Sequence, residues 1–105
     1  AEAIALGQRL GLPMKMVIGA LKQGAGGSWA LDHRAASMLS GEYPTGFKIE
    51  LHHKDLVIAL KSAKDLGLDL PITTKVKEME EELMIKGYRE EDISALHRLI
   101  KPSTN

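Results

Sequence analysis

Lys54 and Asp55 stand side by side in the middle of a long apolar helix that we expect after a loop, between residues 47 and 67. At 100° per residue, Lys54 projects between Val57 and Ile58, so its ammonium group is set in an apolar surround. Burying an unpaired charge costs free energy, and such a lysine therefore normally has a charged partner or a functional task. Lys54 is the first candidate for a binding or catalytic role.

A structural role for Lys54 is the alternative. Glu50 precedes it by four residues, which is the favourable order for an ion pair on a helix. Lysine can also lay its methylene stem on apolar surface while the ammonium group stays in water. Spacing alone favours this structural interpretation, because ion-pair networks perturb charges without serving catalysis.

The histidines and glutamates do not have the spacing of a metal site. Adjacent His52 and His53 point about 100° apart on a helix, so they cannot chelate as a pair four residues apart would. The glutamates at positions 78, 80, 81 and 82 are expected to form a mostly solvated helix face. We therefore predict no metal site and assign His52 and His53 no role.

Composition excludes several classes of protein. The chain has no cysteine, which rules out disulfides, thiolate catalysis and cysteine–zinc sites. Its fourteen basic residues balance fourteen acidic ones without a sustained basic run, which argues against nucleic-acid binding. The longest apolar runs are too short to span a bilayer, and no secretory signal is visible. We expect a cytoplasmic protein.

A glycine-rich connector, QGAGGS, occupies residues 23–28. Such backbone ahead of a helix can bind an anion, but the spacing differs from the dinucleotide fingerprint and no strand precedes it. We favour a turn between two helices in which Ser28 is the N-cap. Trp29, the only tryptophan, is expected to be a packing residue.

Apolar periodicity and the punctuation by glycine and proline predict an all-α domain of about six helices, with one core, over residues 1–105. The expected helices cover about 1–11, 13–24, 29–40, 47–67, 71–87 and 93–100. The helix after Phe47 is apolar on several sides, which is typical of a central helix with neighbours packed around it. Asp92 is expected to be the N-cap of the last helix.

The amino terminus, AEAIAL, has the composition of a helix already under way and carries no N-cap or other start signal. We therefore expect this chain to be a fragment of a longer protein, the parent protein, with its first helix cut.

Several motifs resemble one family in the same order along the chain. They are AEAIAL, the GGSW turn, MLSGEYPTGF, GFKIELHHKDLVIAL, LPIT and KGYREEDISAL. Together they resemble the carboxy-terminal helical domain of the β-hydroxyacid dehydrogenases, which include 3-hydroxyisobutyrate dehydrogenase and tartronate semialdehyde reductase. The resemblance covers almost the whole chain and implies a fold like the C-terminal domain of 6-phosphogluconate dehydrogenase.

The resemblance also implies an activity. Members of this family transfer hydride between NAD or NADP and a short β-hydroxyacid, and their helical domain serves the substrate and dimerisation. By resemblance, Lys54 binds the cofactor near its nicotinamide end, while Phe47 and Asp55 line or shape the substrate cleft. The resemblance therefore implies a small-molecule substrate and self-association. The charge pattern and the short apolar runs argue against a nucleic-acid or membrane partner. The L-H-x-K-D-L pattern is slightly closer to the tartronate semialdehyde reductases.

Two essential parts of that family lie outside the present sequence. The catalytic lysine of a K-x-x-x-N motif would precede Ala1 on the same helix, and the glycine-rich Rossmann domain that holds most of the cofactor would precede it too. This chain therefore carries no catalytic residue of its own, and we expect it to be inactive alone. The alternatives are a non-catalytic helical interaction module on the same fold and, more remotely, an imine or succinic-semialdehyde reductase.

Overall fold

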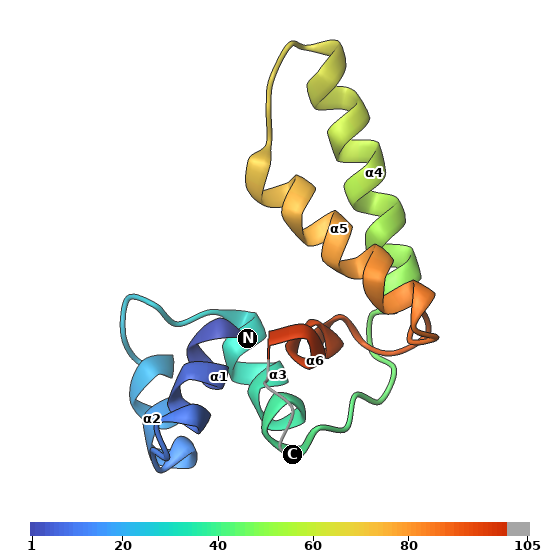
Figure 1. Cartoon of the computed structure of the whole chain (residues 1–105). Helices are drawn as coiled ribbons and strands as arrows, with labels where there is room; N and C mark the ends of the chain where they lie inside the picture. The colour runs from blue at the N-terminus through green and yellow to red at the C-terminus, as the bar shows by residue number, and fades with distance from the viewer. Residues whose placement is uncertain (101–105) are drawn as a thin grey trace.

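The computed structural model describes residues 1–100, and the regular elements of this part of the chain are all helices joined by loops, with no β-strand (Figure 1). An isolated antiparallel bridge joins Lys48 to Asp92. The elements are α1 (Glu2–Arg9), α2 (Met14–Lys22), α3 (Trp29–Ser40), α4 (Ile49–Asp65), α5 (Pro71–Ile85), the 3-10 helix η1 (Ile93–Leu96) and α6 (His97–Ile100). The predicted all-α fold is confirmed, with each element close to its expected bounds.

Local sequence explains where these helices begin and end. The Ser28 hydroxyl accepts a hydrogen bond from the Leu31 N–H at 3.0 Å and so caps α3 as predicted. Pro71 occupies the first turn of α5, where its missing N–H is no loss. Gly67 has a φ of 68° just beyond α4, a left-handed conformation that favours glycine.

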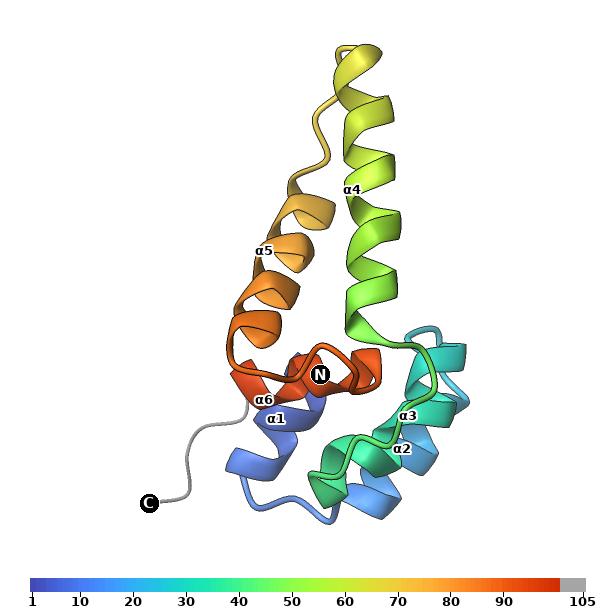
Figure 2. The ribbon, with the colours of Figure 1, turned by 90° about the vertical axis from the view of Figure 1, so that its right-hand side faces the viewer.

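The elements are arranged as a compact base and a projecting arm. Helices α1, α2 and α3 pack against one another, and η1 and α6 lie beside them. Helices α4 and α5 form an antiparallel hairpin that extends away from this base, as two views at right angles show (Figures 1 and 2). No helix in residues 1–100 is long and apolar enough to cross a membrane.

Buried residues form two clusters instead of the single core that we expected. Ile4, Ile18 and Ala35 join α1, α2 and α3 in the base. The second cluster, at the root of the arm, consists of Tyr43, Ile49, Leu83 and Ala95. The arm consists of only two helices, so no third element of residues 1–100 covers them to extend the core along its length.

The expectation that neighbours surround the helix after Phe47 is wrong for the described chain. Helix α4 packs mainly on α5, and its buried residues are Ile49 and Ala63. Its opposite side carries exposed apolar residues, including Leu51 and Ile58. Periodicity shows that several sides of a helix are apolar, but a single neighbour can cover only one of them.

Candidate functional site

The exposed side of α4 holds the charged pair that the sequence singled out. Lys54 and Asp55 are both exposed, and they lie between Leu51 and Ile58, which are exposed as well. These four positions fall within about 100° of one another around the helix. We call them the α4 face. A cation and a carboxylate thus stand on an apolar strip that α5 leaves uncovered.

Lys54 has no charged partner within residues 1–100. Glu50, which could have paired with it, instead has a carboxylate oxygen 3.8 Å from Nη1 of Arg89. The structural interpretation of Lys54 as the partner of Glu50 is therefore wrong. Its ammonium group is available to a ligand or to another part of a larger protein.

Phe47 lies immediately before α4 and is held by its backbone. Its N–H donates to Oδ1 of Asp92 at 2.8 Å, and its carbonyl accepts from the N–H of Ile93 at 2.9 Å. The ring is partly exposed and meets the His52 ring edge-on, with ring centres 5.4 Å apart. Phe47 therefore sits at the base of the arm, at the end of α4 nearest the rest of the chain.

Asp92 does more than the helix cap that the sequence predicted. It caps η1 as expected, accepting from the N–H of Ser94 at 2.9 Å. Arg34 also donates to both of its oxygens, from Nε at 2.9 Å and from Nη2 at 3.1 Å. Burial alone raises the pKa of Asp92, but hydrogen bonds from Arg34, Ser94 and Phe47 outweigh it and hold that pKa well below its usual range.

Trp29 is not the packing residue that we expected, since it is 63% exposed. Its ring stacks on His33 at 4.0 Å between ring centres, and the guanidinium carbon of Arg34 lies 4.7 Å from its centre. A small hollow of about 230 Å³ is lined by Trp29, Arg34 and Asp92, among others. The GGSW turn therefore adjoins the Arg34–Asp92 pair.

Glu80 is an exception to the glutamate face that we expected to be mostly solvated. Its side chain is fully buried, and Oε2 lies 2.6 Å from Nδ1 of His52 across the arm. Burial raises the pKa of Glu80, while the hydrogen bond and charge of His52 partly oppose that shift. Within residues 1–100 its other oxygen, Oε1, has no hydrogen-bond partner. This histidine–glutamate contact joins α4 to α5.

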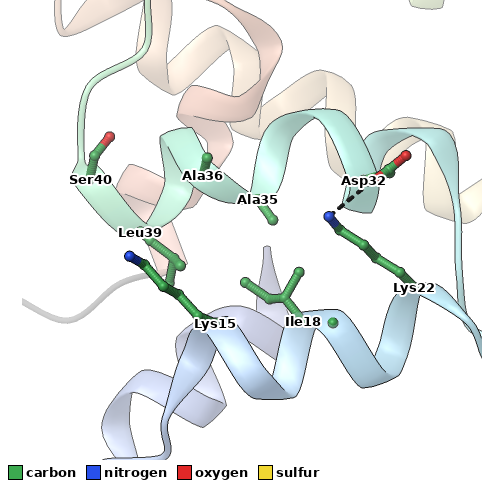
Figure 3. A pocket seen from close by; sticks show the side chains of 9 residues that line it. Lys15, Ile18, Lys22, Asp32, Ala35, Ala36, Leu39 and Ser40 are labelled. Atoms are coloured by element: carbon green, nitrogen blue, oxygen red, sulfur yellow. Dashed lines mark ion pairs between the residues drawn. The ribbon is translucent and has the colours of Figure 1, made fainter.

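A separate groove of about 460 Å³ lies between α2 and α3 (Figure 3). Ile18 and Ala35 face each other across it, and Lys15 and Lys22 stand at its two ends (Figure 3). Lys22 is paired with Asp32 at 3.0 Å. None of the predicted site residues lines this groove, so it is distinct from the α4 face.

The arrangement supports binding more readily than catalysis. An unpaired ammonium group can hold an anionic or polar ligand. The ring of Phe47 contacts His52 rather than Lys54. In the described part of the chain, no group of three histidine or acidic side chains could hold a metal ion. Sequence analysis missed Arg34, and no local signal could have found it, because its partner is 58 residues away.

Comparisons with known proteins agree with this fold. A family model described as NAD-binding of NADP-dependent 3-hydroxyisobutyrate dehydrogenase matches residues 1–100. The 2-hydroxy-3-oxopropionate reductase of Escherichia coli K12 is 34% identical over 105 residues, covering 100% of this chain and 36% of that protein. The L-threonate dehydrogenase of the same strain is 30% identical, covering 99% of this chain and 34% of its own length.

A solved structure is similar over most of the chain. The crystal structure of 3-hydroxyisobutyrate dehydrogenase from Salmonella typhimurium superposes with a TM-score of 0.85 at 30% identity, covering 93% of this chain and 34% of that one. The present chain thus spans about a third of the length of these relatives. The resemblance stated from the motifs is confirmed. This chain belongs to the NAD-binding family of the NADP-dependent 3-hydroxyisobutyrate dehydrogenases.

Proposed function

We propose that this chain is the C-terminal helical domain of an NAD(P)-dependent oxidoreductase that transfers hydride between the nicotinamide cofactor and a short β-hydroxyacid. Family membership supports the reaction class, and the observation that carries the site is Lys54. Its ammonium group is exposed, lies on an apolar helix face and has no ion-pair partner within residues 1–100. A lysine so placed is suited to a ligand or to a facing domain.

Each predicted site residue has a task in this proposal. Lys54 binds the cofactor near its nicotinamide end, where a fixed positive charge can also favour a carboxylate substrate. Asp55 shapes the cleft, and the Phe47 ring keeps water away from the reacting atoms. The bound nicotinamide ring would supply or accept the hydride.

The remaining machinery is proposed to lie before Ala1 in the parent protein. We place there a Rossmann domain that binds most of the cofactor, and a catalytic lysine on the helix that continues into α1. The chain alone is then expected to be inactive. Its parent is expected to be a cytoplasmic homo-oligomer, and the substrate is of the 3-hydroxyisobutyrate or 2-hydroxy-3-oxopropionate type.

The substitution Lys54→Ala in the parent protein tests the proposal. We expect the dissociation constant for NADH or NADPH to rise by about tenfold or more, because a hydrogen bond to a charged group contributes about 1.5–3 kcal/mol. Fluorescence titration with each reduced cofactor measures this, and thermal unfolding checks that stability is unchanged. Lys64→Ala is the matched control, since Lys64 is also exposed on α4 without an ion pair in residues 1–100 but lies away from the α4 face.

Two results would argue against the proposal. If Lys54→Ala reduced the free energy of unfolding by as much as it reduced the free energy of cofactor binding, Lys54 would be a structural residue. A parent sequence without a glycine-rich strand–turn–helix start, or without a lysine upstream of Ala1 on the same helix, would instead favour the non-catalytic interaction module.

A further inference from the structure

Three segments that are far apart in the sequence meet at the carboxylate of Asp92. Arg34 comes from α3, Phe47 from the loop before α4, and Ser94 from η1. These groups donate five hydrogen bonds to Asp92, the shortest from the Ser94 hydroxyl at 2.6 Å. Asp92 is almost fully buried, so its acceptor capacity is used within the protein and it is not placed to bind a ligand.

The same segment holds the start of α4. Lys48, the N-cap residue, makes no side-chain cap, so the first N–H groups of α4 need other partners. The N–H of Ile49 donates to the carbonyl of Glu91 at 3.0 Å, and the N–H of Glu50 donates to the carbonyl of Arg89 at 3.0 Å. Residues 89–92 therefore fix both Phe47 and the first turn of the helix that carries Lys54.

Close packing around this carboxylate depends on Gly46. A Cβ atom added at this position would lie 2.9 Å from Oδ1 of Asp92 and 3.7 Å from Nη2 of Arg34. The distance to Oδ1 is shorter than ordinary van der Waals contact, so the carboxylate or the loop would have to shift. The backbone before Phe47 can approach Asp92 only without a side chain at residue 46.

We propose that Asp92, held by Arg34, is a positioning residue for the cofactor and substrate cleft, because it fixes the backbone of Phe47 and the start of α4. This inference rests on the proposed function, in which Phe47 lines the cleft. Asp92 touches neither cofactor nor substrate in this proposal. It acts through the orientation of Phe47.

General stabilisation of the fold is the competing explanation, and the chain offers a matched control for it. Glu91 forms an equally direct pair with Arg98, with both distances 2.8 Å, and Arg98 lies over the rings of Tyr43 and Tyr88. This pair is one residue away from Asp92, yet its side chains make no hydrogen bond to Phe47. Removal of the Glu91 carboxylate therefore breaks a two-point ion pair, at a more exposed position, without releasing Phe47.

The test compares Asp92→Ser with Glu91→Ser in the parent protein. Serine can still cap η1, but it is too short to reach both Arg34 and the Phe47 N–H. We expect backbone hydrogen exchange around residues 46–50 to become about tenfold faster in Asp92→Ser and to change less than about twofold in Glu91→Ser. Exchange at Ala63, near the far end of α4, is the internal reference.

Steady-state kinetics then separate positioning from stability. We expect Asp92→Ser to raise the KM for substrate about as much as Phe47→Ala does, and the double variant to be no worse than Phe47→Ala alone. Such non-additivity indicates that the two residues act through one contact. Independent, additive losses would overturn the proposal, and so would unchanged exchange around residues 46–50.

Failure of the proposed function would look different. If Phe47→Ala left KM and kcat unchanged while Asp92→Ser still released residues 46–50, the positioning of Phe47 would stand and its place in the cleft would be wrong. If Asp92→Ser did not fold, Gly46→Ala would replace it, since its Cβ displaces the Asp92 carboxylate without removing a charge. The same local rise in exchange is expected there, and its absence would overturn the proposal.

Discussion

Two buried carboxylates show how much the partners of a single residue matter. Asp92 accepts five hydrogen bonds, and its pKa is lowered despite its burial. Glu80 is fully buried, its one hydrogen-bond partner within residues 1–100 is His52, and burial raises its pKa. Hydrogen bonds stabilise the charged form of a carboxyl group, whereas burial without enough of them favours the neutral form.

Glu80→Gln should make stability less sensitive to pH. Because the pKa of Glu80 is raised in the folded state, its contribution to stability is complete below the ordinary glutamate pKa and is lost as pH rises through the folded value. Glutamine does not ionise, so the variant should gain stability relative to the unsubstituted protein as pH rises above the ordinary glutamate pKa of about 4.3. Urea unfolding at several pH values measures this difference. A difference that stays constant across those pH values would contradict the raised pKa.

At the scale of elements, α4 and α5 form an arm whose stability is concentrated at its root. Leu83 of α5 is fully buried in one cluster with Ile49 at the start of α4. Farther along, the arm is two helices wide and leaves apolar side chains such as Ile58 exposed. The position of the α4 face therefore depends on a few contacts near the base.

Leu83→Ala should loosen both helices of the arm. Truncating a fully buried leucine costs about 2–5 kcal/mol through lost burial and the cavity left behind. Ile85→Ala is the control on the same helix, because Ile85 is 86% exposed and its loss should cost less than about 0.5 kcal/mol. Urea unfolding gives the two free-energy changes. Equal effects of the two substitutions would contradict the packing described for α5.

At the scale of the whole molecule, two buried clusters are linked by the C-terminal elements. Asp92 ties η1 to Arg34 of α3, and Nε2 of His97 lies 2.9 Å from Oε1 of Gln8 in α1. The described chain measures 45 × 33 × 23 Å, which is extended for a domain of this size. Such a shape leaves the sides of the arm open to contact with other parts of the parent protein or with a second copy.

The parent protein is expected to self-associate. Exposed apolar residues lie on both helices of the arm, and their burial against a second subunit would remove them from water. Sedimentation velocity over a range of concentrations measures the oligomeric state. A monomer at the highest concentration reached would count against self-association and against the proposed dimerisation role of this domain.

Sequence alone was enough to determine the helical elements, because helix boundaries depend on neighbouring residues. Ser28 caps α3, Pro71 begins α5 and Gly67 follows α4, each as its residue type predicts. The motifs around Phe47 and Lys54 were also sufficient to identify the family that the comparisons confirm. The site roles of these residues remain predictions.

Tertiary structure decided which side of each helix is covered and which charges meet. Periodicity shows that α4 is apolar on several sides, but only the packing of α5 leaves the side with Lys54 exposed. Likewise, a run of glutamates gives no sign that Glu80 alone is buried against His52. Arg34 and Asp92 are 58 residues apart, and their pairing depends on how α3 and η1 pack. Local propensity carries no information about such long-range contacts, which depend on how several elements pack together.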